Sequence, residues 1–115
     1  MLTTMARHDK VLHALADPTR RSILDRLRKA PLSVGDIAAS LPVSRPAVSQ
    51  HLRVLEGAGL VRARKEVTRR VYSVELQGIV ELRRYLDRMW DEALASFGAA
   101  ADASARRLGG KRRGR

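Results

Sequence analysis

Side chains with the chemistry to read DNA bases are concentrated in one short stretch of the chain. At about 100° per residue, Val48, Leu52 and Leu55 form one apolar stripe of a helix. Gln50 and Arg53 lie on the opposite side of that helix. An arginine can bond guanine with two hydrogen bonds, and a glutamine can bond adenine in the same way. The pattern predicts a helix whose polar side enters a DNA major groove, with the candidate contacts Ser44, Arg45, Pro46, Ser49, Gln50, His51 and Arg53.

The polar side of this helix has a simpler alternative interpretation, an ordinary surface helix with a solvated face. Proline and glycine punctuation around the helix and a basic segment directly after it favour DNA binding. His51 lies roughly 60–70° off the apolar stripe. At that angle it can donate a hydrogen bond to a phosphate or pack as a half-buried side chain, and both interpretations stay open.

A second group of basic residues follows the helix. Residues 60–65 and 70–74 have the composition of two strands, and residues 66–69 form a candidate hairpin turn. Two strands beside a recognition helix can bring cations to phosphates or to a minor groove. The alternative is a solvated hairpin whose charges prevent pairing with other sheet edges. The expected DNA contacts in the hairpin are Arg64, Lys65, Thr68, Arg69 and Arg70.

Other groupings of reactive side chains are weaker. Asp87 and Asp91 are four residues apart and can hold a hard cation, although ion pairs with neighbouring arginines are the preferred interpretation. His8 and His13 are five residues apart and fall on different faces of a helix, which leaves a shared metal only across a dimer. The sequence shows no nucleophile–base arrangement and no glycine-rich phosphate loop. We therefore expect no catalysis, no cofactor and no metal.

Capping signals divide the chain into five expected helices. Asp17 followed by Pro18 is typical of a helix start, and Ser33 with Asp36 resembles a capping box. Ser44 is placed to cap the helix that carries the candidate DNA contacts. The expected fold is therefore mainly α with a small β-hairpin, and its helices cover residues 5–16, 18–30, 34–40, 45–56 and 77–97.

The last expected helix has a larger apolar face than a small domain needs at its end. Pairing of two copies would bury that face, and packing against the first helix is the alternative; we expect both. The expected dimer-interface residues are Met5, Leu12, Leu82, Leu86, Met89, Trp90, Ala93, Leu94 and Phe97.

Composition limits the remaining possibilities. The length of 115 residues suits one domain, expected over residues 1–99, and a basic tail, residues 100–115, is expected to be disordered. The tail either adds affinity for DNA phosphates that is independent of the DNA sequence, or it only keeps the protein in solution. A net charge of +11 favours polyanionic partners. Because the chain has no cysteine and no apolar run of membrane-spanning length, we expect a cytoplasmic protein without a membrane partner.

Two motifs resemble the arsenical-resistance-repressor (ArsR) family of winged helix-turn-helix regulators. They are LADPTRRSIL at residues 15–24 and VSRPAVSQHL at residues 43–52, followed by Leu55 and by the segment GLV at residues 59–61. The similarity covers about residues 6–97. It implies five helices with a two-stranded wing, a homodimer joined through the first and last helices, and a repressor that occludes a promoter until a signal releases it.

The chain resembles the subgroup of that family without metal-binding motifs. Residues 34–36 are Val-Gly-Asp where metal sensors carry cysteines, and the expected last helix has no histidine. The resemblance therefore implies a non-metal signal, of unknown small-molecule or protein nature.

We expect a sequence-specific regulator that binds double-stranded DNA. Arg45 and Gln50 should contribute mainly sequence preference, and Arg69 should contribute affinity for every sequence. Two alternatives remain: a sequence-neutral, chromosome-organising DNA-binding protein, and a winged-helix module that binds other proteins.

Overall fold

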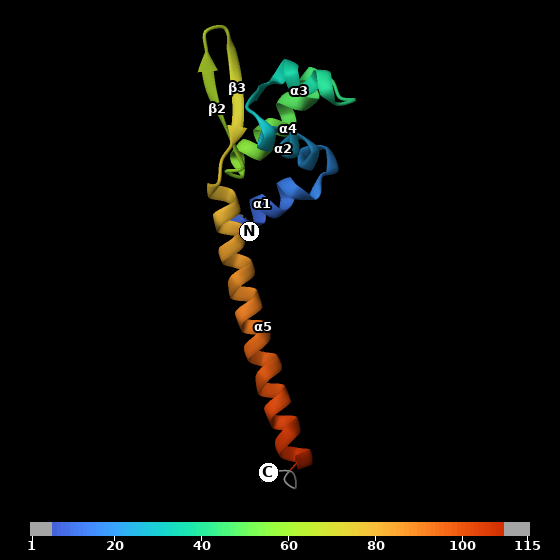
Figure 1. The fold of residues 1–115 in the computed structure, drawn as a ribbon, viewed down its shortest axis with the longest axis vertical. Helices are drawn as coiled ribbons and strands as arrows, with labels where there is room; N and C mark the ends of the chain where they lie inside the picture. Colours follow the sequence, from blue (N-terminus) through green and yellow to red (C-terminus); the bar gives the residue numbers. More distant parts are fainter. Residues whose placement is uncertain (1–5, 110–115) are drawn as a thin grey trace, which may run out of the picture. The chain divides into compact units, whose positions relative to one another are not determined.

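The computed structural model describes residues 6–109, with side chains described through Arg107. The chain divides into two compact units after Arg83, within its last helix. Figure 1 shows the elements in chain order: α1 (Arg7–Ala16), α2 (Pro18–Lys29), β1 (Leu32–Ser33), α3 (Val34–Ser40), α4 (Arg45–Gly57), β2 (Val61–Glu66), β3 (Arg69–Val74) and α5 (Gln77–Gly109).

Three helices begin at the capping residues that the sequence predicts. Before α2, Asp17 accepts a hydrogen bond from the backbone N–H of Arg20 at 3.0 Å. Before α3, Ser33 and Asp36 exchange hydrogen bonds of 3.2 and 3.3 Å in a capping box. Before α4, Ser44 accepts from a backbone N–H at 3.3 Å. These bonds satisfy N–H groups that a helix start otherwise leaves unpaired, which confirms the predicted capping.

One hydrophobic core holds the first unit together. Val48, Leu52 and Leu55, the predicted apolar stripe of α4, are fully buried in it. Burying one large aliphatic side chain contributes about 1.5–3 kcal/mol, so this stripe fixes which side of α4 faces outward. The other fully buried large side chains of the core are Val11, Ile23, Ile37, Leu60 and Val61.

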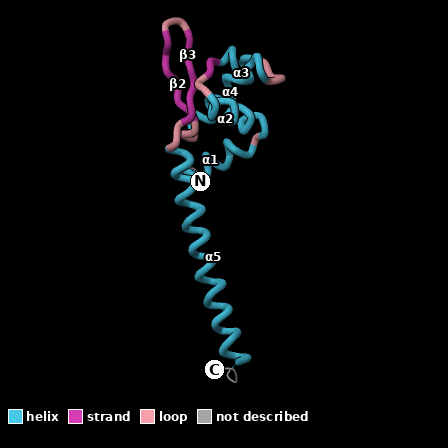
Figure 2. The backbone as a smooth tube through the Cα atoms, in the orientation of Figure 1, coloured by secondary structure: helices cyan, strands magenta, loops and turns pink. Residues whose placement is uncertain are grey.

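The hairpin belongs to a three-stranded antiparallel sheet with the order β1-β3-β2. The predicted two-stranded wing is confirmed as β2 and β3, but the short strand β1 was not predicted. Its two residues lie opposite Tyr72 and Val71 and come directly before α3 (Figure 2). A strand of two residues is too short to show the alternation of apolar and polar side chains that identifies strands in a sequence. Ser33 also caps α3, so the sequence signal at this residue indicates a helix start.

Two glycines join the end of α4 to the start of α5. Gly59 has a φ of 73°, a left-handed conformation that favours glycine. The N–H of Gly78 donates to the carbonyl oxygen of Gly59 at 2.8 Å. A Cβ atom on Gly78 would overlap the carbonyl oxygen of Ala58. The two backbones can therefore approach this closely only because residue 78 has no side chain.

The final helix is longer than the sequence analysis predicts. α5 continues through Gly109 rather than ending at residue 97, so the expectation of disorder is wrong for residues 100–109. Alanine, the strongest helix former, is frequent after residue 97, and Arg106 and Arg107 lie where the helix dipole favours cations. Residues 110–115 of the expected tail lie outside the described residues. Within residues 6–109, no helix combines the length and apolar composition that crossing a membrane requires.

Candidate nucleic-acid interface

The polar side of α4 faces outward. Of its predicted DNA contacts, Ser49 and His51 are half-buried, and none is buried in the core. The remaining members of the predicted set are all exposed, namely Ser44, Arg45, Pro46, Gln50 and Arg53. The structure thus brings the candidate contacts together on one accessible helix face.

Arg45 lies against the start of α3. A Cβ atom on Gly35 would be 3.0 Å from one terminal nitrogen of the Arg45 guanidinium and 3.3 Å from its central carbon. The absence of a side chain on Gly35 therefore leaves room for the guanidinium beside the α3 backbone. The first arginine of the candidate helix is held close to the neighbouring helix of the helix-turn-helix pair.

For His51 the structure bears out partial burial, and the contact with a phosphate stays a prediction. It is half-buried, and a terminal nitrogen of Arg20 lies 3.3 Å from its Nδ1. It also lines a shallow hollow together with Pro46, Ala47 and Gln50. One ring nitrogen of His51 thus has a partner within the chain, and the residue also belongs to the outward surface of α4.

Arg20 and Arg21 have structural roles that the sequence did not reveal. Arg20 donates to the carbonyl oxygens of Ala14 and His13 at 2.8 and 3.1 Å, at the end of α1. Arg21 donates to those of Leu15 and Ala16 at 2.7 and 3.2 Å. The last carbonyls of a helix need donors. The sequence signal for this role is the position of two arginines shortly after the expected end of the first helix.

Arg20 lowers the pKa of the Asp17 carboxyl in two ways. The backbone N–H of Arg20 is the main cause that lowers the pKa of the Asp17 carboxyl, and the positive charge of the same residue lowers it further. The carboxylate therefore stays ionised beside the arginine that contacts α4.

The predicted cationic side chains of the hairpin are all exposed, as is Thr68. Lys65 and Arg70 are directly opposite each other on β2 and β3, and Arg64 lies opposite Val71. Two like charges directly opposite in a sheet destabilise the pair, so this arrangement is better suited to a polyanionic ligand than to stability.

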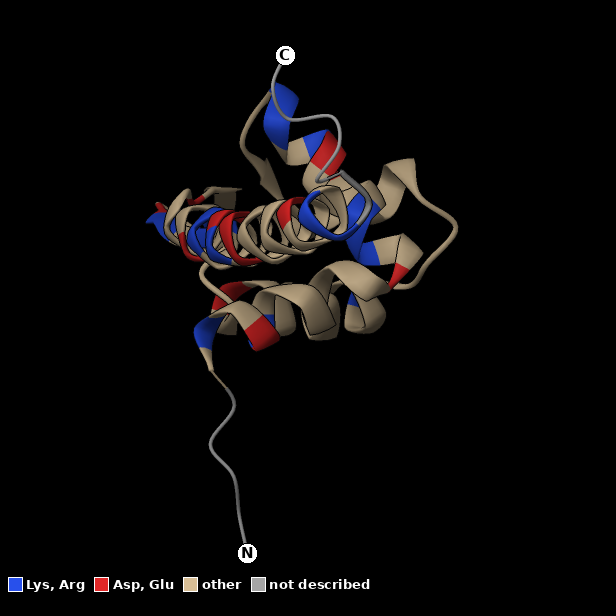
Figure 3. Ribbon diagram, turned by 90° about the horizontal axis from the view of Figure 1, so that it is seen from below, with Lys and Arg blue, Asp and Glu red and all other residues tan. Residues whose placement is uncertain are grey.

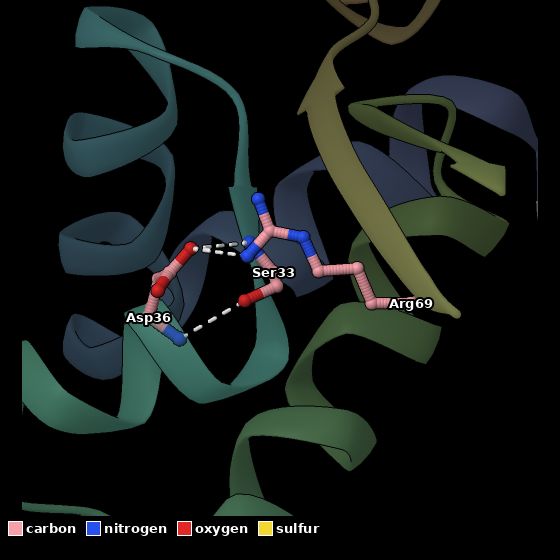
Figure 4. Close-up of polar contacts among 3 residues, drawn as sticks. All are labelled: Ser33, Asp36 and Arg69. Atoms are coloured by element: carbon pink, nitrogen blue, oxygen red, sulfur yellow. Dashed lines mark hydrogen bonds and ion pairs between the residues drawn. The ribbon is translucent and has the colours of Figure 1, made fainter. Parts of the chain in front are cut away.

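Two of the arginines predicted as DNA contacts in the hairpin already have acidic partners. Arg64 pairs with Glu66, and hydrogen bonding from Arg64 is the main cause that lowers the pKa of that carboxyl. Arg69 lies 3.5 Å from Asp36 of α3 (Figure 4). A surface ion pair of this kind contributes at most about 1 kcal/mol, so a phosphate can replace either carboxylate.

Asp36 connects the wing to the helix-turn-helix pair (Figure 4). Its carboxylate accepts from the backbone N–H of Ser33 and also faces Arg69. Hydrogen bonding to the side chain and backbone of Ser33, followed by the Arg69 charge, lowers the pKa of Asp36. An ionised Asp36 thus favours both the start of α3 and the observed position of the arginine.

The weaker metal candidates do not belong to a larger cluster of ligands within the described residues. His8 lies 3.6 Å from Asp9, its neighbour in α1. No group of three or more potential metal ligands (His, Cys, Asp or Glu) is found in the described part of the chain. Asp87 and Asp91 lie on α5, which Figure 3 shows with basic and acidic residues interspersed along its length.

The predicted dimer-interface residues on α5 form a large exposed apolar surface. Exposed fractions run from 47% for Leu86 to 73% for Phe97. Leu82 is half-buried and packs against the core of the first unit, and Met5 lies outside the described residues. The other exposed members of the predicted set are Leu12, Met89, Trp90, Ala93 and Leu94.

Comparison with known proteins gives one consistent family. A model described as a helix-turn-helix domain matches residues 15–64. The chain is 49% identical over 102 residues to the HTH-type transcriptional regulator Rv2034 of Mycobacterium tuberculosis, covering 89% of this chain and 95% of the relative. Other relatives include proteins named as transcriptional repressors and one named as a transcriptional activator.

Solved structures agree with the sequence relatives. An ArsR-like transcriptional regulator from Rhodococcus sp. RHA1 matches with a TM-score of 0.71 and 35% identity, over 83% of this chain and 92% of that one. The homodimeric winged helix-turn-helix DNA-binding domain of Mb0332 from Mycobacterium bovis matches with a TM-score of 0.61 and 32% identity, over 76% and 82%. The chain belongs to the ArsR family of winged helix-turn-helix transcriptional regulators.

Proposed function

We propose that this protein is a homodimeric repressor that binds a specific sequence in double-stranded DNA and is released by a non-metal signal. One observation carries the proposal: α4 buries its apolar stripe and leaves a continuous polar face exposed next to a cationic hairpin. A helix with this division can enter a major groove without losing its packing on the core.

The two parts of the interface have different tasks. Arg45, Gln50 and Arg53 of α4 have side chains long enough to reach base edges, where one bidentate pair gives about 1–3 kcal/mol of discrimination. Ser44 and Ser49 are short and suit phosphate oxygens. The hairpin supplies charge through Arg64, Lys65, Thr68, Arg69 and Arg70, and charge attracts phosphates of every sequence.

The dimer sets the geometry of the target. Two copies of α4 would enter successive major grooves about 34 Å apart on a near-palindromic site. The homodimeric winged helix-turn-helix DNA-binding domain of Mb0332 supports two copies as the working form. A bound dimer covering a promoter excludes other proteins from it, which is repression.

Selection of bound duplexes from a random pool, followed by sequencing, identifies the target site. Titrations then compare that site with a random duplex. Arg45→Ala and Gln50→Ala should weaken binding to the selected site by about 5–150-fold and change binding to the random duplex little. Lys65→Ala and Arg70→Ala should weaken both by the same factor, and each should reduce the dependence of log K on log salt concentration by about one.

Lys10→Ala on α1 is the control for removing one exposed cation elsewhere. A ratio of selected to random affinity near one supports instead a sequence-neutral, chromosome-organising protein. No shift of any duplex at low salt supports a protein-interaction module.

A further inference from the structure

We propose that Arg20 of α2 is a positioning residue for DNA recognition: it fixes His51 in the tautomer whose Nε2–H donates to a DNA phosphate. This inference rests on the proposed function and adds to it a residue that lies outside the recognition helix and the wing.

The chemistry of the contact fixes the tautomer. A terminal nitrogen of Arg20 lies 3.3 Å from Nδ1 of His51. A guanidinium only donates hydrogen bonds, so Nδ1 must be the acceptor and cannot carry a proton. In the neutral ring the proton is then on Nε2. The side chain of His51 makes no further hydrogen bond within the described residues, so its Nε2–H is available to an outside acceptor.

Arg20 is itself held firmly. Its Nε and its other terminal nitrogen donate to the carbonyl oxygens of Ala14 and His13, at 2.8 and 3.1 Å. Its backbone N–H donates to Asp17 at 3.0 Å. Three elements thus meet at one guanidinium: the end of α1, the start of α2 and the middle of α4. A donor fixed in this way orients the imidazole before any ligand arrives.

The surroundings of the imidazole suit a phosphate oxygen. His51 lines the hollow formed with Pro46, Ala47 and Gln50, on the outward side of α4. Pro46 has no N–H to donate, and the N–H of Ala47 is already bonded to Ser44. A phosphate oxygen in the hollow can therefore accept a hydrogen bond from the ring N–H of His51. The exposed amide side chain of Gln50 lines the same hollow. Because the imidazole is neutral, its Nε2–H can be oriented toward the hollow without electrostatic repulsion between His51 and Arg20.

The central test compares two arginines. Arg20→Met removes the contact with His51 and also two bonds to the end of α1. Arg21→Met is the matched control, because it removes two equivalent bonds to the end of α1 and, within the described residues, none to α4. Arg20→Met should weaken binding more than Arg21→Met, by up to about tenfold, because complete loss of one hydrogen bond to a charged group sets the upper limit and a tautomer mixture loses part of it. Because the acceptor is a phosphate, the factor should be equal on the selected and random duplexes.

Substitutions of His51 separate the roles of its two nitrogens. Gln keeps a donor near the position of Nε2, whereas Asn keeps a polar group only near that of Nδ1. His51→Gln should bind within about threefold of the wild type, and His51→Asn should lose about tenfold. In a His51→Ala background, Arg20→Met should have no further effect on DNA affinity beyond that of Arg21→Met. Two-bond ¹H–¹⁵N spectra of the free protein should show His51 as the Nε2–H tautomer, and a tautomer mixture in Arg20→Met.

The results that overturn the inference are specific. They are an Nδ1–H tautomer in the wild type, equal losses in Arg20→Met and Arg21→Met, or a loss confined to the selected duplex, which assigns His51 to a base. The two proposals also fail separately. A wild-type protein that binds no duplex contradicts the proposed function, whereas normal wild-type binding with equal losses in the two arginine variants contradicts only the positioning role.

Discussion

Asp36 shows how one side chain can serve two elements. Its carboxylate completes the capping box of α3 with Ser33, and it also holds Arg69 of the wing at 3.5 Å. Hydrogen bonding to Ser33 is the larger cause of its lowered pKa, and the charge of Arg69 adds to it. The residue therefore favours the folded state only while it is ionised.

Acid should remove this contribution. The pKa of Asp36 is lower in the folded protein than its ordinary value of 3.8, so the unfolded chain binds the proton more readily. The stabilisation is complete well above pH 3.8 and is lost as pH falls through the lowered value. Asp36→Asn should therefore be less stable than the wild type at pH 7, and the two should converge in strong acid. Urea unfolding between pH 7 and pH 2.5 measures this, and parallel curves would contradict it.

Local chemistry explains which residues the sequence could identify. The Ser33–Asp36 box and the outward face of α4 depend on residues three or four apart, so spacing alone predicts them. The role of Arg20 depends on carbonyls of α1 and on an imidazole 31 residues away. No periodicity within α2 encodes those partners, so the sequence alone does not reveal this role of Arg20.

The hairpin contains a local conflict between residue type and backbone. The register places Glu66 opposite Arg69, which leaves a two-residue loop of Val67 and Thr68. Val67 has a φ of 47° and is 93% exposed. A β-branched residue is disfavoured in this left-handed region, so the turn is held by the pairing of the strands and not by its own sequence.

Val67→Asn should relieve this conflict. Asparagine tolerates a positive φ, and the left-handed conformation costs an ordinary residue roughly 1–2 kcal/mol, so the free energy of unfolding should rise by about 1 kcal/mol. Thr68→Asn is the matched control, because residue 68 does not have a positive φ. Denaturant unfolding compares the two. A gain of equal size in both variants would show that backbone strain at Val67 is not the cause.

The junction between α4 and α5 should be intolerant of any side chain. A Cβ atom on Gly78 would overlap the backbone oxygen of Ala58, and backbone cannot move aside as a side-chain end can. We expect Gly78→Ala to destabilise the protein by about 1–3 kcal/mol or more. Gly57→Ala is the control: a Cβ there meets nothing within 4 Å, and alanine in a helix is favoured over glycine by up to about 1 kcal/mol. Thermal unfolding should move the two variants in opposite directions, and a neutral Gly78→Ala would contradict the close approach.

Helix starts are predictable from the sequence because a cap depends on three or four adjacent residues. The strand β1 and the end of α5 are not predictable in this way. β1 exists because β3 offers it a partner across the sheet, at Tyr72 and Val71. The basic, glycine-rich composition near the C-terminus predicts an earlier end of α5 than the structure shows, because alanine favours the helix there. In the structure, alanine-rich helix extends past residue 97.

Charge acts over the entire protein. A net charge of +11 attracts any duplex, and the candidate interface carries exposed cations on both α4 and the hairpin. Sequence preference must therefore come from the few side chains of α4 that reach base edges, superimposed on a strong background of non-specific affinity.

Dimer formation should depend on the apolar face of α5. Trp90 is 65% exposed and Phe97 is 73% exposed, and such aromatic side chains on an unpartnered face commonly dominate an interface. Trp90→Glu should raise the dimer dissociation constant by at least about 30-fold, because a hot-spot aromatic typically contributes 2 kcal/mol or more.

Ala95→Glu adds the same charge about 170° around the helix from the centre of the apolar face and is the matched control. Sedimentation equilibrium should show a shift toward monomer for Trp90→Glu alone. Since one α4 helix then meets one half-site, affinity for the selected duplex should fall in the same variant and be retained in Ala95→Glu. A monomeric wild type at micromolar concentration, or a Trp90→Glu variant that dimerises and binds like Ala95→Glu, would place the dimer contact elsewhere.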